Sequence, residues 1–335
     1  MKKDLKIFIG ISFIIPYLMG FAIYYCKQHN IETNIYPLLQ MFIPFLGVIA
    51  LLHKEDKNIL KISVIRIYLV TSIILFALSI INIFNPEFSK FSEFVILFSA
   101  IPMIIAISTM DKEVKKKLSL NNPNKKMTLL MCLIFIFIYF LRLFFGCILE
   151  GETREIVEVF NLHSLKVFIS IIIFSFLNIM PFIGEEYGWR AYLAPRLKEI
   201  YGLKNSILLT GFIWGIWHLP LNLFYYSDGL LTSQIYSILV QLVFCIFLGI
   251  FLTYAYNRTK SIWAPVMIHY LNNNLALLFV TDFSKDIFSG QHYDLKGTLF
   301  SIVSSIILFG IFMFSKYVKD ENLWEKSVYE KVNES

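Results

Sequence analysis

The amino-acid sequence predicts an all-α protein, a polytopic bundle of about ten transmembrane helices. The composition is 57% hydrophobic and 16% charged, with a mean hydropathy of +0.66, whereas a soluble domain carries nearer a quarter charged residues. The apolar residues also come in blocks of roughly 20, the length that crosses a hydrocarbon core at about 1.5 Å per residue. These two observations exclude a soluble globular domain.

Ten apolar segments stand out in windows of about 19 residues, and we expect each to enter the membrane. They are residues 7–25, 37–52, 62–84, 91–108, 127–149, 165–183, 206–224, 232–256, 262–281 and 297–316. The second and fourth segments are short, so each is interpreted as either a tilted or a re-entrant segment. The first lacks a small-residue cleavage site and is interpreted as a retained span rather than a signal peptide.

The loops predict the orientation, because positive charge is retained on the cytoplasmic side. With ten spans and a cytoplasmic N-terminus, every strongly basic segment falls inside: residues 53–61, 112–126, 190–204 and 257–260 and the C-terminal tail. The outer loops carry few lysines, and the loop that begins at Glu150 is acidic. We therefore expect both termini in the cytoplasm and the chain in a plasma membrane.

Charge and cysteine usage exclude other classes of protein. The net charge of +6 does not indicate nucleic-acid binding, because the basic residues lie between apolar segments rather than on one face. The four cysteines have no paired spacing and are interpreted as packing residues. The bias toward Lys, Ile, Asn and Phe is typical of an AT-rich bacterial genome. Arg142, inside the fifth segment, is interpreted as a side chain that reaches toward the outer interface.

Polar side chains at membrane depth are costly and mark candidate functional sites. Of the six histidines, His218 and His269 lie well within predicted spans. A lone intramembrane histidine is often a helix-packing residue, but two on nearby spans with carboxylates close by favour a site. The carboxylates are Glu185 and Glu186, at the predicted cytoplasmic end of the sixth span. Glu186 lies four residues before Arg190 and can pair with it along one helix face, which leaves Glu185 free to point into the bundle.

Two more pairs have the same four-residue spacing. Trp214 can support the imidazole of His218, and His269 shares a helix face with Asn273. Counted at 1.5 Å per residue, Glu185 and the two histidines can meet in the cytoplasmic half of the bilayer. We expect one polar cavity that opens toward the cytoplasmic leaflet.

Such a set permits hydrolysis without a covalent intermediate. A carboxylate and an imidazole can hold and deprotonate a water, while a second imidazole and a carboxamide donate hydrogen bonds to the oxyanion. The trio Glu185, His218 and His269 is also able to ligate zinc with one open position, so a divalent metal stays an alternative. Other intramembrane protease signatures are missing: the sequence contains no H-E-x-x-H, no pair of intramembrane aspartates and no Gly-x-Ser-x-Gly.

Three ordered motifs resemble the CPBP family, which comprises CAAX prenyl proteases and bacteriocin-processing (Abi) proteins. They are EEYGWR, WGIWH and HYLNN, on three separate apolar segments within residues 165–280. The resemblance implies an intramembrane endopeptidase in which Glu185 and His218 activate water and His269 and Asn273 form the oxyanion site. It assigns orienting roles to Glu186, Arg190 and Trp214; Trp214 stands where the family often has Phe.

The resemblance also divides the chain. We expect N-terminal helices over residues 1–160, a catalytic membrane core over 161–283, and a final span with a cytoplasmic tail over 284–335. The expected partners are the bilayer and a membrane-associated protein or peptide substrate. Family members are described both as metal-dependent and as metal-independent glutamate proteases; we favour no required cofactor, because no third ligand lies at short spacing from either histidine.

Two other classes of protein remain as alternatives. A non-catalytic bacteriocin-immunity or scaffold protein would keep the fold, but it predicts an eroded motif set, whereas all seven motif positions are filled here. A transporter would use buried His and Glu as proton relays, but no inverted repeat is detected.

Overall fold

A computed structural model describes residues 2–151, 161–280, 288–326 and 328–333, and it is all-α, as predicted. Within these residues the one β-type pairing is an isolated bridge between Ser227 and Gln291. The helices are α1 (Lys2–Gln28), α2 (Ile35–Glu55), α3 (Ser63–Phe84), α4 (Phe91–Thr109), α5 (Lys112–Lys117), α6 (Lys125–Glu150), α8 (Leu162–Phe174), α9 (Met180–Glu186), α10 (Ala194–Tyr201), α11 (Leu203–Trp217), α12 (Leu219–Leu221), α13 (Leu231–Thr259), α14 (Trp263–Asn274), α15 (Leu295–Gly310), α16 (Lys316–Lys319) and α17 (Val328–Asn333).

Eight helical stretches in the described residues are long and apolar enough to cross a membrane. They coincide with eight of the ten predicted segments, and the short second and fourth segments are full-length stretches at Ile35–Glu55 and Pro86–Thr109. The other two predicted segments contain shorter helices. One is α8, and the other is α14 continued by the 3-10 turn η5 (Leu275–Phe279).

The sixth predicted span is interrupted, which changes the depth assigned to the motif that follows it. Helix α8 ends at Phe174, and a new helical stretch runs from α9 through the π-helical turn η3 (Tyr187–Leu193) into α10. Residues 190–204 were predicted to form a cytoplasmic loop, but 190–201 are helical and Arg190 is 1% exposed. The hydropathy window did not predict this helical stretch, because the stretch contains charged residues that are buried inside the protein.

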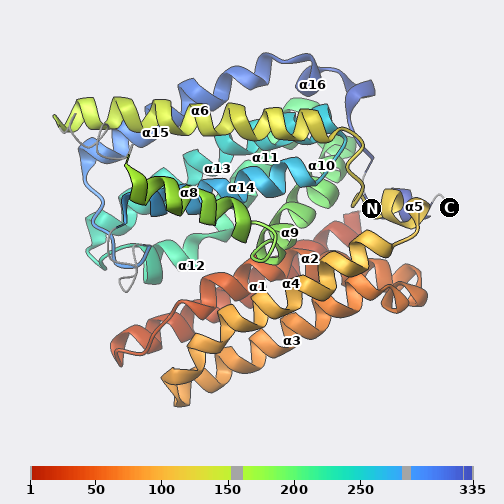
Figure 1. The fold of residues 1–335 in the computed structure, drawn as a ribbon, viewed down its shortest axis with the longest axis horizontal. Coiled ribbons are helices and arrows are strands. Elements are labelled where there is room, and N and C mark those ends of the chain that lie inside the picture. Colours follow the sequence, from red (N-terminus) through yellow and green to blue (C-terminus); the bar gives the residue numbers. More distant parts are fainter. Residues whose placement is uncertain (1, 152–160, 281–287, 327, 334–335) are drawn as a thin grey trace.

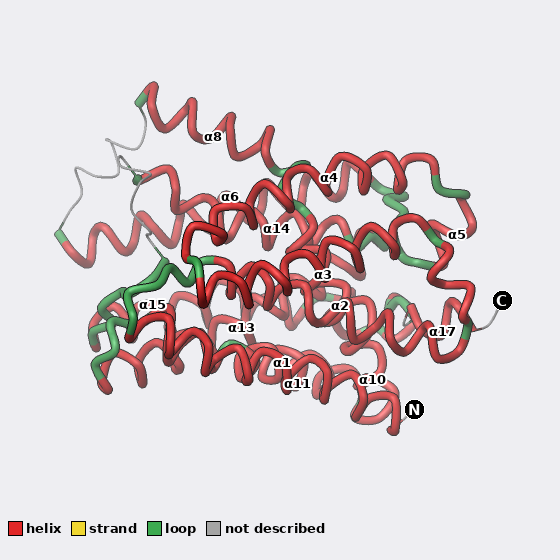
Figure 2. The backbone as a smooth tube through the Cα atoms, turned by 90° about the horizontal axis from the view of Figure 1, so that it is seen from below, coloured by secondary structure: helices red, strands yellow, loops and turns green. Residues whose placement is uncertain are grey.

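Figure 1 shows two groups of helices, with α9 between them. Helices α1 to α4 lie side by side, while α6, α8, α11, α13, α14 and α15 form the second group. Both ends of the drawn chain lie at the same end of the bundle as α5 and α10, which Figure 2 shows from a second side. The predicted domain boundaries after residues 160 and 283 and the acidic loop beyond residue 151 fall outside the described residues.

Glycine allows α9 to pack directly on α2. A Cβ at Gly184 would lie 2.2 Å from the carbonyl oxygen of Met41, and one at Gly188 would lie 2.4 Å from Cβ of Pro44. Both separations are far below van der Waals contact, so only glycine permits this approach. The close contact holds Glu185 and Glu186 against the N-terminal helices.

The N-terminal helices also fix the end of α11, where His218 stands. Pro220 has no N–H to donate to the carbonyl of Ile216, which would continue the helix; the Tyr17 hydroxyl donates to that carbonyl instead, at 2.9 Å. The Trp217 indole donates to the carbonyl of Ser12 at 2.8 Å, and Gln40 donates to the carbonyl of Trp217 at 3.0 Å. The segment before His218 is thus bound to both α1 and α2.

Arg142 in α6 does not match the expectation that it reaches toward the interface. Its Nε donates to Ser304 on α15 at 3.1 Å, and its Cζ lies 5.3 Å from the ring centroid of Phe244 on α13. A hydroxyl and an aromatic face within the bundle therefore take the place of water as its partners.

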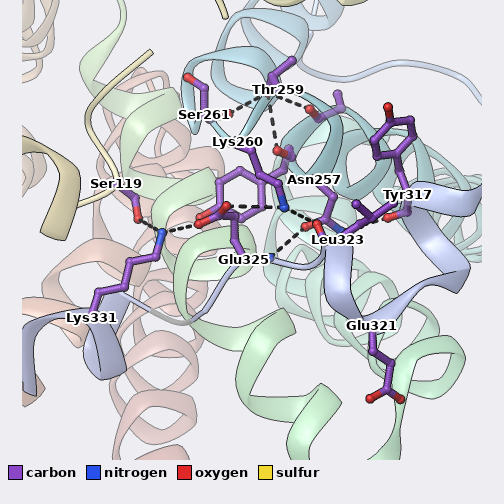
Figure 3. A network of polar contacts seen from close by, with 12 residues as sticks. Ser119, Asn257, Thr259, Lys260, Ser261, Tyr317, Glu321, Leu323, Glu325 and Lys331 are labelled. Carbon is purple, nitrogen blue, oxygen red and sulfur yellow. Dashed lines mark hydrogen bonds and ion pairs between the residues drawn. The ribbon is translucent and has the colours of Figure 1, made fainter. Parts of the chain in front are cut away.

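The C-terminal tail is bound to the helix connections by a polar network (Figure 3). Glu325 forms ion pairs with Lys331 and with Lys260, which ends α13 in the left-handed conformation at φ 56°. Lys331 also donates to Ser119 at 3.2 Å, and Lys260 donates to the carbonyl of Leu323. Burial raises the pKa of Glu325, but the two lysines outweigh it and hold that pKa below its usual value of 4.5.

We predict that Glu325→Gln loosens the tail and increases deuterium uptake in residues 316–326. The lysines stabilise only the ionised carboxylate, so this contribution is complete above the unfolded pKa, near 4.5, and is lost as the pH falls through the lower folded pKa. Hydrogen exchange measured at pH 7 and then below pH ~4 should show the difference between wild type and variant shrinking. A difference of the same size at both pH values would contradict the assignment.

Candidate active site

One cavity of about 400 Å³ collects the polar residues that the sequence analysis selected. Its lining includes Glu185 from α9, Trp214 and His218 from the end of α11, and His269 and Asn273 from α14. Glu185, His218 and His269 are 2%, 6% and 4% exposed. Their side chains are thus withdrawn from the surface and face a common space.

Trp214 links the acid to both imidazoles. Its indole Nε1 donates to Oε2 of Glu185 at 2.6 Å. The centroid of the indole lies 5.3 Å from the ring of His269, edge to face, and 5.9 Å from the ring of His218. The sequence predicted an aromatic support for His218, but not this hydrogen bond to the carboxylate.

The Nδ1 atom of His218 is bound to the backbone. It lies 2.9 Å from the carbonyl oxygen of Trp214, one helical turn earlier. Because a carbonyl can only accept, Nδ1 carries the proton, and the Nε2 atom of a neutral ring keeps its lone pair. Trp217 packs edge to face on the ring at 4.8 Å and fixes its plane.

Glu186 is fully buried and is not among the residues that line the cavity. One of its oxygens lies 2.8 Å from Nδ1 of His269, and the other lies 3.3 Å from Nε of Arg190. The guanidinium carbon of Arg190 lies 4.7 Å from the ring centroid of Trp214. The sequence predicted the Glu186–Arg190 pair and missed the contact with His269, which joins residues 83 positions apart.

Asn273 belongs to a run of three asparagines at the end of α14, and all three line the cavity. The side-chain oxygen of Asn273 accepts from the amide of Asn272 at 3.0 Å. The amide nitrogen of Asn273 therefore keeps its donors for the cavity.

The proposed metal ligands are not grouped as a metal site in this structure. In the parts of the chain that the structure describes, no group of three His, Cys, Asp or Glu side chains is arranged to hold a metal ion. Glu185 accepts from Trp214, and the Nδ1 atoms of both histidines are engaged. These contacts engage only one atom of each side chain, and a histidine held through Nδ1 by a carbonyl or a carboxylate can still bind a metal through Nε2. Zinc therefore stays an alternative, and no step below uses a metal.

Residues from the N-terminal helices and from one end of the bundle complete the cavity. Pro37, Leu38 and Met41 of α2 supply a wall that no motif predicted. Residues from four turns and helix ends at one end of the bundle also line it: Asn34, Glu93, Tyr225, Tyr226 and Phe288. The charge pattern predicts that these turns lie outside the membrane, which is opposite to the expected opening toward the cytoplasmic leaflet.

A second cavity of about 600 Å³ lies beside the first, between α4 and α8. The two cavities share four lining residues, Leu38, Glu93, Asn178 and Asn274. The broken sixth span therefore leaves room for an extended ligand next to the polar cavity.

Comparison with known proteins identifies the segment that contains this cavity's polar residues. Residues 165–275, about a third of the chain, match the family model described as type II CAAX prenyl endopeptidase Rce1-like. The resemblance to the CAAX protease family is confirmed. All seven motif residues lie within this matched segment, whereas α1 to α6 and α15 lie outside it.

A curated relative supports the same assignment. CAAX prenyl protease 2 of Methanococcus maripaludis is 31% identical over 145 residues, which are 42% of this chain and 50% of the relative. The chain thus spans about half the length of the curated relative that it matches. No solved structure matches the chain.

Proposed function

We propose that the chain is an intramembrane endopeptidase that hydrolyses a peptide bond of a membrane-associated protein or peptide. Its substrate class is that of CAAX-type processing or of bacteriocin and leader-peptide processing. The observation that carries the proposal is one cavity lined by a buried carboxylate, two buried imidazoles and a carboxamide. The match of residues 165–275 to the CAAX endopeptidase family model and the name of the curated relative support it.

The water that attacks the peptide is activated by Glu185 and His218. Oε2 of Glu185 accepts from Trp214, which leaves Oε1 to accept a proton from a water in the cavity. The lone pair on Nε2 of His218 accepts the second water proton in a hydrogen bond and orients the oxygen. The hydroxide attacks the carbonyl carbon, and Glu185 then passes its proton to the departing amine.

The oxyanion that forms in this step is held by His269 and Asn273. With Nδ1 of His269 bound to Glu186, the ring presents Nε2 to the cavity, and the carboxylate balances the charge of a doubly protonated ring. Nε2–H and the amide of Asn273 then donate to the oxyanion. Glu186 and Arg190 act as positioning residues, because they contact His269 and Trp214 rather than the substrate.

The proposal is tested by comparing membrane peptides from cells that express wild type and cells that express Glu185→Ala at equal levels. We expect at least one membrane-associated protein to lose a processed form in the variant. Equal processing in both strains would contradict peptidase activity and would favour a non-catalytic immunity or scaffold role.

Activity is predicted to survive metal removal. If Glu185 and His218 activate the water directly, exhaustive chelation of the detergent-purified protein leaves the turnover of an identified peptide unchanged. Loss on chelation that stoichiometric zinc restores would contradict the prediction and identify Glu185, His218 and His269 as the ligands to test first.

The proposed location and partners of the protein follow from the distribution of its charged and apolar residues. We propose a bacterial plasma membrane with both termini in the cytoplasm, because the basic segments alternate with the spans. The bilayer and a membrane-associated peptide are the proposed partners.

A further inference from the structure

The polar cavity is built from one end of the bundle. Asn34 precedes α2, Tyr225 and Tyr226 end the π-helical turn η4 (Asn222–Tyr226), and Phe288 precedes α15. Helix α12, just before η4, lies far from α5, α10 and the marked chain ends in Figure 1. Among the described residues, none from α5, α10, α16 or α17 lines the cavity.

The positions of the lining residues along their helices also place the cavity near this end of the bundle. Pro37 and Met41 lie in the first two turns of α2, and Glu93 lies in the first turn of α4. His218 lies after the last residue of α11, and Asn273 lies at the end of α14. Each of these helices has its other terminus at the end of the bundle that carries α5 and α10.

Positive charge gathers at that other end. The turns, short helices and ends of long helices there contain a large set of basic residues: Lys54, Lys57, Lys61, Lys112, Lys115, Lys116, Lys117, Lys125, Lys126, Lys198, Lys204, Arg258, Lys260, Lys316, Lys319 and Lys331. Among the described residues of the cavity end, the basic side chains are Lys27, Lys90, Lys166 and Lys296. Because Lys and Arg in short loops are retained in the cytoplasm, the basic end faces the cytoplasm and the cavity end faces outward.

We propose that the substrate enters the cavity from the extracytoplasmic face. This inference rests on the proposed peptidase function and narrows its substrate class to peptide segments that are exposed outside the membrane. Export of the segment across the membrane must then precede its cleavage. A cytoplasmic protein with a free C-terminal tail would meet the basic end, where the tail network of Lys260, Glu325 and Lys331 covers the helix connections.

Cysteine accessibility in intact cells tests the direction without requiring activity. The probe is a small, membrane-impermeant, negatively charged methanethiosulfonate, applied to Asn273→Cys in the cavity and to Lys116→Cys at the basic end. The four native cysteines are buried, so wild type reports background labelling. Tyr226→Cys at the cavity mouth serves as a second variant where Asn273→Cys gives little folded protein.

We expect Asn273→Cys and Tyr226→Cys to react in intact cells, and Lys116→Cys to react only after lysis. Reaction of Lys116→Cys in intact cells, or protection of both cavity variants until lysis, would overturn the proposal. If the chain is not a peptidase, a different experiment shows it: the membrane peptides are then the same in cells that express wild type and cells that express Glu185→Ala. If peptides do change, their cleavage sites should lie on the outer side of the substrate's membrane segment.

Discussion

Glu185→Gln is expected to reduce peptide hydrolysis below detection while leaving the protein folded. Glutamine keeps a carbonyl oxygen that accepts the indole N–H of Trp214, so the packing around position 185 is preserved. It cannot take a proton from water, and general-base catalysis typically contributes about 10²–10⁴ in rate. The measurement is the turnover of an identified peptide by purified protein, together with its melting temperature.

Related substitutions show whether the loss follows the proposed roles. His218→Ala is expected to match Glu185→Gln, because both residues act on the water. Asn273→Ala should be milder, since losing one oxyanion donor costs about 10²–10³ in rate. Glu113→Gln, an exposed carboxylate on α5, is the matched control and should behave as wild type. Full activity of Glu185→Gln would refute the assigned base.

Glu186→Ala is expected to lower the amount of folded protein at least as much as the turnover. The substitution leaves the guanidinium of Arg190 buried without its counter-charge and removes the partner of His269. Breaking a buried ion pair from one side typically destabilises by about 3–5 kcal/mol. The thermal midpoint and the yield of monodisperse protein in detergent measure the effect.

A compensating double variant separates lost charge balance from lost packing. Glu186→Leu combined with Arg190→Met removes both charges and keeps much of the buried volume. It should be more stable than Glu186→Ala and still be impaired in turnover, because His269 is no longer held. A double variant less stable than Glu186→Ala would contradict the charge-balance account.

Most of the fold was predictable from hydropathy, because apolar length directly reflects the thickness of the bilayer. Eight of the ten predicted segments contain full-length apolar helices in the described residues. The sixth segment was predicted poorly for a physical reason. Its helix stops at Phe174, and the stretch that follows buries Glu185, Glu186 and Arg190 in the protein rather than exposing them to lipid.

The candidate site was predictable as far as local spacing reaches. The ion pair of Glu186 with Arg190 follows from their positions four residues apart on one helix. The hydrogen bond from Trp214 to Glu185 and the contact of Glu186 with His269 join different helices, so no spacing reveals them. The sequence analysis counted the depth of Glu185 from the end of an uninterrupted helix, whereas the helix that precedes it ends at Phe174.

The cavity wall supplied by α2 comes from a different part of the chain than the proposed catalytic residues. The groups proposed to perform hydrolysis all lie within residues 165–275, whereas Pro37, Leu38 and Met41 come from a region that the family match does not include. Under the proposed function, the hydrolytic groups and part of the wall that would contact the substrate are encoded in different stretches, so that one is able to diverge while the other is held constant. Exchange of the first two helices between related chains is a direct route to new cleavage preferences on an unchanged catalytic segment.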